Sequence, residues 1–242
     1  MHKHLFLIIL LFPFLAFSQK EDDKKQAEFG IHLRPIFESA AFGTAPINVE
    51  GDELSFVINQ TSGFSYGAII RYEIIKNINF EGGLSVTTRN IRLDISDSEF
   101  DYNLQTNFKF LTYEFPINLM TKVRFTDQWK LAAAFGATMD FLPSDVESFG
   151  EDNSYDHRTF YRSWIQAALT AHTGVEWESK ESGAFYLGVS YHRPFQDLAV
   201  TRVETNKWNP QLNRNESNEL VGSINGTYLT VDFRYFFNDT KR

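Results

Sequence analysis

Residues 109–123 read KFLTYEFPINLMTKV, and an apolar side chain occupies every second position from Leu111 to Leu119. The positions between them include Thr112, Glu114 and Asn118. Successive side chains of a β-strand point to opposite faces, so this alternation predicts a strand with one apolar and one polar face. The stretch is longer than the roughly 5–6 residues of most strands in soluble domains. A tilted strand that crosses a bilayer needs about 9–11 residues.

The same alternation recurs along most of the chain. It predicts eight strands, each of about ten residues or more, at 29–37, 64–74, 78–88, 109–123, 129–141, 165–177, 185–191 and 229–237. Short connections at 75–77, 125–128 and 179–182 alternate strictly with long polar ones at 39–62, 90–107, 143–162 and 196–226. Outer-membrane barrels have this asymmetry, with short periplasmic turns and long outside loops.

Charged side chains gather on one face of the predicted strands. An Arg or Lys on the lipid side of a barrel costs about 2–4 kcal/mol at the bilayer midplane, so the apolar face must be outside and the charges inside. The interior of an eight-stranded barrel is only wide enough for side chains to fill it, so these charges should pair with one another. The predicted interior polar network comprises Arg34, Arg71, Glu73, Glu81, Glu114, His172, Glu176, His192, Asp232 and Arg234.

The predicted fold is therefore all-β, an eight-stranded antiparallel up-and-down transmembrane β-barrel with short periplasmic turns and long extracellular loops. A soluble sandwich or lipocalin-like barrel is the alternative, but it would need an apolar interior and a charged exterior. Small inward residues such as Gly67, Gly174 and Gly188 should leave room for larger partners. Aromatic residues near the strand ends fit two interfacial girdles better than simple core packing: Tyr72, Tyr113, Trp129, Trp177, Tyr191 and Tyr235.

The first 19 residues, MHKHLFLIILLFPFLAFSQ, have the layout of a secretory signal peptide. The apolar run is too short for the roughly 20 residues of a spanning helix, which is the alternative. We therefore divide the chain into a signal peptide at 1–19, a polar segment at 20–27, the barrel at 28–237 and a tail at 238–242. Both ends of the mature chain are expected in the periplasm.

Composition excludes other classes. The chain has 242 residues, no cysteine, 16% aromatic residues and a net charge of −8. No disulfide or cysteine-based metal site is possible. Without a Lys/Arg-rich run, an acidic chain is a poor nucleic-acid binder.

The segment Tyr113-Glu114-Phe115-Pro116-Ile117-Asn118-Leu119 resembles the signature of the PorT-like outer-membrane β-barrel family of Bacteroidota, with Tyr113, Glu114 and Pro116 as the matching motif residues. The resemblance covers about 29–237 and implies an outer-membrane location and a barrel fold; a few members are similar to components of gliding or secretion machinery. The chain departs from the usual pattern because it runs five residues past Phe237. Proline inside a strand removes a ladder donor, so a kink is expected at Pro116.

The sequence offers three candidate chemistries beside a purely structural role. His32, His172 and His192 share the inward parity and could hold a metal with Glu114 or Glu176, although inward histidines more often join a polar network. Asp152, Asp156 and His157 could form an Asp/His catalytic group of the kind found in outer-membrane proteases, which need a larger barrel. A charged interior argues against a lipid-modifying enzyme, and no nucleotide or hydrolase motif is present.

We therefore expect a non-enzymatic, monomeric outer-membrane barrel without a cofactor. It would contact membrane lipid and bind other envelope or secretion proteins. The alternative is a narrow channel or small-ligand transport barrel, and the two differ in whether the inward charges plug the lumen.

Overall fold

The computed structural model describes residues 27–37, 45–151, 154–179 and 181–237. The predicted signal peptide, the polar segment up to residue 26 and the tail at 238–242 lie outside the described residues. Within those ranges, no helix is long and apolar enough to cross a membrane. The strands are β1 (Ala27–Ile36), β2 (Ile47–Glu50), β3 (Leu54–Ile75), β4 (Ile78–Asp97), β5 (Tyr102–Arg124), β6 (Trp129–Phe141), β7 (Val146–Phe149), β8 (Tyr155–Tyr161), β9 (Ile165–Ser179), β10 (Gly183–Pro194), β11 (Ala199–Asn209), β12 (Arg214–Ile224) and β13 (Tyr228–Phe236).

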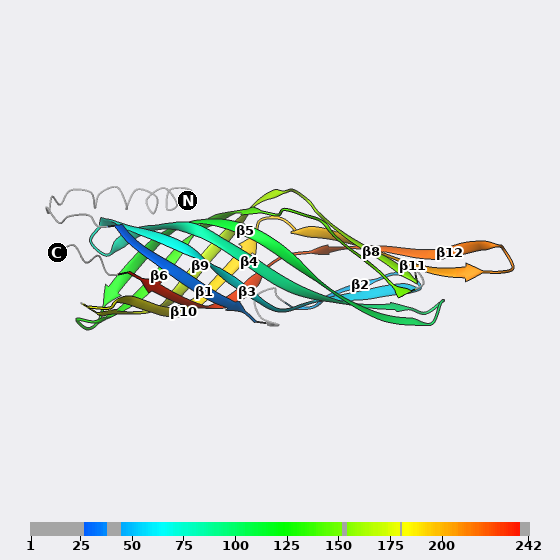
Figure 1. Ribbon diagram of the computed structural model, residues 1–242, viewed down its shortest axis with the longest axis horizontal. Helices are drawn as coiled ribbons and strands as arrows, with labels where there is room; N and C mark the ends of the chain where they lie inside the picture. Colours follow the sequence, from blue (N-terminus) through cyan, green and yellow to red (C-terminus); the bar gives the residue numbers. More distant parts are fainter. Residues whose placement is uncertain (1–26, 38–44, 152–153, 180, 238–242) are drawn as a thin grey trace, which may run out of the picture.

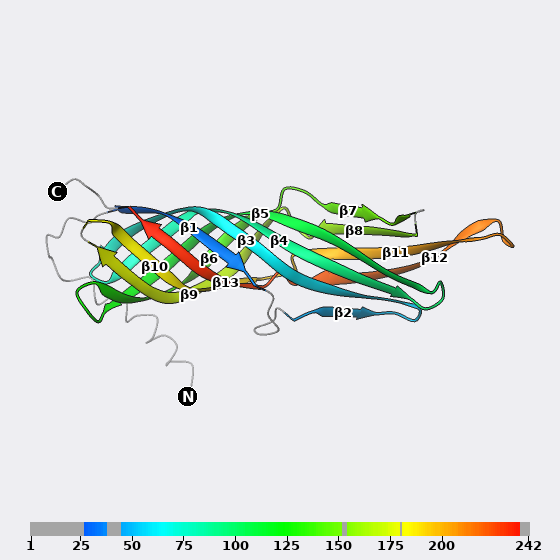
Figure 2. The ribbon, with the colours of Figure 1, turned by 60° about the horizontal axis from the view of Figure 1, so that its bottom comes forward.

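Eight of the described strands close into an antiparallel ring (Figures 1 and 2). Their order around the ring is β1-β13-β10-β9-β6-β5-β4-β3, and β1 closes it by pairing with both β13 and β3. All eight predicted strands are found in this ring. The short connections β3–β4, β5–β6 and β9–β10 lie at one end of it, where β1 begins and β13 ends (Figure 2). We call this the turn end.

The tightest connection at the turn end joins β3 to β4. Ile75 pairs with Ile78, which leaves only Lys76 and Asn77 in the turn. Asn77 takes a φ of 67°, a left-handed conformation that asparagine tolerates better than most residues. Three aromatic side chains, Trp129, Trp177 and Phe185, form a row on the outer surface at this end. Trp177 lies in the middle, since it pairs with Trp129 on one side and with Phe185 on the other.

Three strands of the ring continue far beyond it. β3, β4 and β5 have 22, 20 and 23 residues, and each is longer than the strand predicted from the sequence. Their far halves, together with β2, face a second sheet ordered β12-β11-β8-β7 (Figure 1). We call these two layers the extension.

The polarity of the strands reverses between the ring and the extension. On β4 the inward residues Glu81, Ser85 and Arg89 are polar, but Ile91, Leu93 and Ile95 on the same face are apolar and buried. The outward face changes in the opposite sense, from Phe80, Leu84 and Val86 to Asn90, Arg92 and Asp94. β5 changes in the same way between Thr112 and Phe110. The ring is therefore apolar outside, whereas the extension has an apolar interior and a polar exterior.

The core of the extension lies between its two layers. β3, β4 and β5 contribute Phe56, Leu93 and Phe110, while β11 contributes Val203 from the opposite sheet; each is at most 1% exposed. Burying large apolar side chains stabilises such a sandwich by about 1.5–3 kcal/mol each.

The prediction of four long polar loops is therefore wrong, because the described parts of these segments contain strands. The segment 39–62 carries β2 and the first part of β3, and residues 90–97 and 102–107 extend β4 and β5. The segments 143–162 and 196–226 carry β7, β8, β11 and β12. The regular alternation continues in these segments, but the apolar face has moved to the inside. In β3 a register shift between Gln60 and Gly63 also interrupts the pattern.

Pro116 interrupts a ladder without changing its register. The β4–β5 pairing lacks Gly83 and Leu84 opposite Pro116 and Phe115, yet Gly82↔Ile117 and Ser85↔Glu114 keep the same offset on either side. The missing proline N–H accounts for this local gap.

Candidate functional site: the polar interior of the barrel

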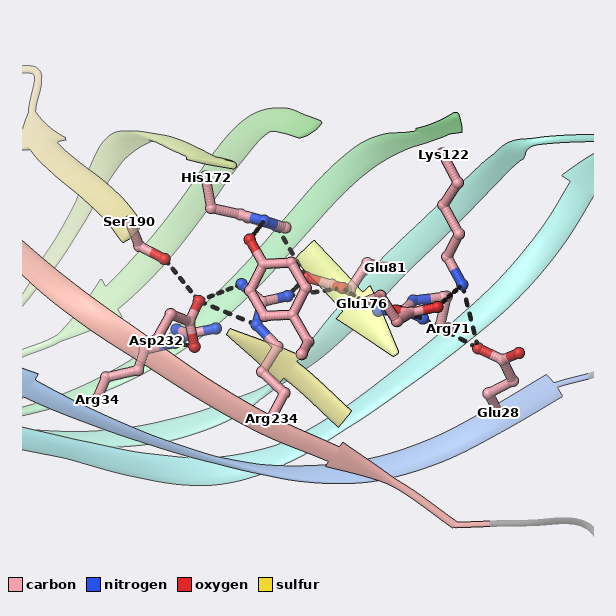
Figure 3. Close-up of polar contacts among 11 residues, drawn as sticks. Glu28, Arg34, Arg71, Glu81, Lys122, His172, Glu176, Ser190, Asp232 and Arg234 are labelled. Carbon is pink, nitrogen blue, oxygen red and sulfur yellow. Dashed lines mark hydrogen bonds and ion pairs between the residues drawn. The ribbon is translucent and has the colours of Figure 1, made fainter. Parts of the chain in front are cut away.

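A network of buried charges crosses the ring near its turn end (Figure 3). At its centre, Arg71 on β3 contacts Glu176 on β9 at 2.8 Å, and Lys122 on β5 contacts the same carboxylate at 2.7 Å. Glu28 lies 3.1 Å from Arg71 at the edge of the group. We call the whole set the lower network: Glu28, Arg34, Arg71, Glu81, Lys122, His172, Glu176, Tyr186, Ser190, Asp232 and Arg234.

The other half of the lower network is built around Arg234 on β13. Its guanidinium contacts Glu81 at 2.7 Å and also pairs with Asp232. Asp232 accepts further hydrogen bonds from Arg34 at 2.9 Å and from Ser190 at 2.6 Å (Figure 3). The Arg34 contact bridges a break in the β1–β13 ladder, where the position of Pro35 is unpaired.

The lower network is balanced in charge. Arg34, Arg71, Lys122 and Arg234 face Glu28, Glu81, Glu176 and Asp232. Charges away from bulk water are tolerated only when they are paired and hydrogen-bonded, and this balance meets that condition. The interior pairing expected from the sequence is thus found for Arg34, Arg71 and Arg234.

Aromatic rings lie against the arginines. Arg71 lies over the ring of Phe236 at 3.7 Å, and Arg234 lies over Tyr186 at 4.6 Å. Tyr186 needs the small residues beside it, because a Cβ on Gly188 would stand 2.4 Å from its hydroxyl and one on Gly174 2.8 Å from its ring. The predicted role of the interior glycines is therefore seen at these two positions.

A second polar group lies in the interior nearer the extension. Glu114 on β5, Asp140 on β6 and His192 on β10 are all buried, and their potential ligand atoms lie within 4.8 Å of one another. His192 Nε2 is 2.8 Å from Asp140, and the Tyr228 hydroxyl donates to Glu114 at 2.7 Å. We call Glu114, Asp140, His192 and Tyr228 the upper cluster.

One residue predicted for the network lies outside it. Glu73 has the inward parity, but it sits beside the β3–β4 turn, where the strand leaves the ring. Its side chain is exposed and accepts a hydrogen bond from the Asn77 backbone N–H at 3.2 Å. The remaining predicted residues divide between the two groups: Arg34, Arg71, Glu81, His172, Glu176, Asp232 and Arg234 in the lower network, and Glu114 and His192 in the upper cluster.

Several members of the two groups were missed from the sequence. Lys122 and Asp140 lie in predicted strands with the inward parity, so a strict count of parity would have found both. Glu28 precedes the first predicted strand. Tyr186 and Tyr228 are inward aromatics, which a search for charges overlooks.

The three histidines of the predicted metal site are not brought together. His172 contacts Glu81 at 3.1 Å, His192 contacts Asp140, and neither ring nitrogen of His32 has a hydrogen-bond partner. Within the described ranges, the single group with metal-ligand spacing is Glu114, Asp140 and His192. Asp140 was not among the expected ligands.

Of the predicted Asp/His catalytic group, the two described members do not come together. Asp152 lies outside the described residues. Asp156 and His157 are neighbours on β8 and point to opposite faces: Asp156 pairs with Arg158 at 2.9 Å, whereas His157 is buried between Ser148 and Thr159, each at 2.8 Å. Burial lowers the pKa of His157 to about 4, which makes the imidazole a weak base.

Comparison with known proteins supports the fold. No family model and no curated protein matches the chain. Among solved structures, outer membrane protein OprG from Pseudomonas aeruginosa has a TM-score of 0.51 at 12% identity, over 90% of this chain and 99% of that one. The COG4313 outer membrane channel from Pseudomonas putida F1 and the outer membrane protease OmpT from Escherichia coli have TM-scores of 0.26 and 0.29, both at 9% identity. Each comparison covers 91% of this chain, with 100% and 99% of the two neighbours. The chain has the β-barrel fold of outer-membrane proteins.

Proposed function

We propose that this chain is a monomeric outer-membrane barrel with a closed lumen, which presents its extension at the cell surface to a protein partner of the envelope or secretion machinery. The observation that carries the proposal is the reversal of polarity along β4 and β5. An apolar exterior suits lipid, and a polar exterior over an apolar core suits water.

The height of the apolar exterior fits a bilayer. On β5 it runs from Val123 to Leu111, about 40 Å of strand. A tilt of about 40° reduces this to roughly 30 Å along the barrel axis, close to the thickness of a hydrocarbon core. The turn end, with both chain ends, would then lie in the periplasm.

This sidedness can be tested with single cysteines, because the chain has none of its own. Gln211→Cys lies at the tip of the β11–β12 hairpin, and Asp127→Cys lies in the β5–β6 turn. A membrane-impermeant maleimide added to intact cells should label Gln211→Cys and leave Asp127→Cys unlabelled until the outer membrane is permeabilised. The reverse pattern would invert the topology, and equal labelling in a soluble periplasmic fraction would end the membrane proposal.

The closed lumen separates the partner-binding role from the alternative of a narrow channel. The lower network joins strands on all sides of the ring, and the core of the extension lies above it. The purified protein should therefore give no steady conductance in planar bilayers. A reproducible conductance, absent from a mock preparation, would favour the channel instead.

The partner is expected at the β11–β12 hairpin, which reaches farthest from the ring (Figure 1). Trp208 and Leu212 are 55% and 53% exposed there, so two large apolar side chains are available to a partner. A photo-crosslinking residue at Leu212 should capture one envelope protein in living cells, and the same residue at Asp127 should not capture it. The proposal assigns no reaction to the chain.

The narrower relationship to PorT-like barrels of Bacteroidota remains part of this proposal. It rests on Tyr113, Glu114 and Pro116. Glu114 faces the interior and Tyr113 the exterior, as expected of alternate positions on one strand.

A further inference from the structure

The upper cluster contains two carboxylates and an imidazole, the side chains of a metal site. The proposed function gives this cluster no role. We propose that Glu114, Asp140 and His192 bind one divalent first-row transition-metal ion, such as Zn²⁺, inside the barrel. The three residues come from β5, β6 and β10, so one bound ion would tie together three strands of the ring.

The first argument is charge. Among the described contacts, no Lys or Arg pairs with Glu114 or Asp140, in contrast to the fully paired lower network. The guanidinium of Arg89 lies 5.3 Å from the Tyr228 ring, but it donates to the Gly226 carbonyl and the Thr112 hydroxyl. The two buried carboxylates thus have no Lys or Arg partner among these contacts, and a divalent cation would compensate their two negative charges.

The second argument is a pair of buried oxygens without partners. Ser85 lies directly opposite Glu114 in the β4–β5 ladder, and Gln166 lies opposite Asp140 in the β6–β9 ladder. Ser85 is fully buried and its Oγ has no hydrogen-bond partner; the Gln166 side chain leaves its Oε1 unpartnered at 3% exposure. Buried polar atoms are rarely left unsatisfied, so these two oxygens favour a bound ion, or a water that it holds, beside the cluster.

The third argument is that each ligand is already held in place. The Tyr228 hydroxyl donates to Glu114, and the Thr138 hydroxyl donates to Asp140 Oδ1 at 2.9 Å. Asp140 Oδ2 lies 2.8 Å from His192 Nε2, so two of the three proposed ligand atoms already face each other. The His192 ring stacks on Tyr228 with centroids 4.5 Å apart. Metal ligands in proteins are commonly oriented by neighbours of this kind.

The geometry requires only a small closure. Ligand atoms at about 2 Å from one ion lie roughly 3–4 Å apart. The ligand atoms of Glu114, Asp140 and His192 lie within 4.8 Å of one another, so their side chains would move by about 1 Å to bind one ion. An imidazole with two carboxylates suits Zn²⁺ or Mn²⁺, whereas Mg²⁺ prefers oxygen ligands alone.

The test is to fold the full chain in detergent with Zn²⁺ or with Mn²⁺, remove free metal, and count bound ions by mass spectrometry. Faster gel migration before boiling confirms that each sample is folded. The native protein should retain about one ion per chain, while Asp140→Asn and His192→Gln should lose it. His157→Gln, which removes a buried histidine of the extension, is the matched control and should bind like the native chain.

A milder variant covers the case in which those substitutions prevent folding. Thr138→Ala removes only the hydroxyl that holds Asp140, and it should weaken binding about 10-fold or more. A folded native chain that retains no ion after folding with either metal would overturn the proposal, and the contact between His192 and Asp140 would then be structural only. Native stoichiometry in folded Asp140→Asn and His192→Gln would overturn it as well.

Discussion

At the scale of single residues, Arg71 shows why every buried charge of the interior needs its partners. Its side chain is fully buried and contacts Glu28, Glu81 and Glu176. A buried ion pair contributes little relative to an apolar pair of the same shape, because desolvation opposes the Coulomb attraction. Removing one partner is different, since the charge left behind is buried and unpaired.

Arg71→Leu is therefore expected to lower the free energy of unfolding by about 3–5 kcal/mol, as it leaves Glu176 with Lys122 alone. Urea unfolding in lipid vesicles measures the change. The control is Arg202→Ala, which removes an exposed pair with Glu219 at 2.8 Å and should cost less than about 1 kcal/mol. Equal effects of the two substitutions would show that the burial of the pair does not matter.

His157 gives the extension a dependence on pH. The folded pKa is about 4 and the unfolded value is near 6.5, so the unfolded chain binds the extra proton between these two pH values. Stability is therefore fully present above about pH 6.5 and falls as the pH drops toward 4, by about 3 kcal/mol at most. The difference in urea midpoint between the native chain and His157→Gln should widen toward neutral pH in favour of the native chain. A constant difference from pH 7 to pH 4.5 would contradict this assignment.

At the scale of elements, the outward face of a strand distinguishes the ring, where that face is apolar, from the extension, where it is polar. Leu119, 56% exposed, and the exposed Gln105 both point outward from β5, one on the ring and the other on the extension. Leu119→Arg should destabilise the folded protein by about 2–4 kcal/mol in a bilayer, whereas Gln105→Arg should have little effect. Unfolding in lipid vesicles separates the two; similar small effects would place the membrane boundary elsewhere on β5.

The alternation of side chains between the two faces of each strand also explains how much of the fold the sequence could predict. It located all eight ring strands and the inward face that carries Arg34, Arg71 and Arg234. It failed at Ile91 on β4, where the apolar face changes sides and the alternation resembles the start of a polar loop. The contact between Asp140 and His192 could not be predicted from the sequence. β6 and β10 are not paired with each other; they are brought close because β9 lies between them and pairs with both.

At the scale of the whole molecule, the ring and the extension are two bodies built partly on the same three strands. The ring is closed by hydrogen bonds between β1 and β13 and does not need the second sheet for that closure. The extension has no closed ladder of its own and depends on the apolar core between its layers. Damage to that core should therefore remain in the extension.

Leu93→Ala tests this division, because Leu93 is fully buried in the extension core. The substitution leaves a cavity that should cost about 2–5 kcal/mol. Since the ring below keeps its ladders and its charge network, protease should cut the variant within the extension and leave a membrane-embedded fragment that still migrates as a folded barrel before boiling. Met120→Ala, at a fully buried position inside the ring, is the matched comparison and should weaken that folded migration instead. If Leu93→Ala abolished folded migration as well, β3, β4 and β5 would transmit the damage across the polarity boundary, and the two bodies would be a single cooperative unit.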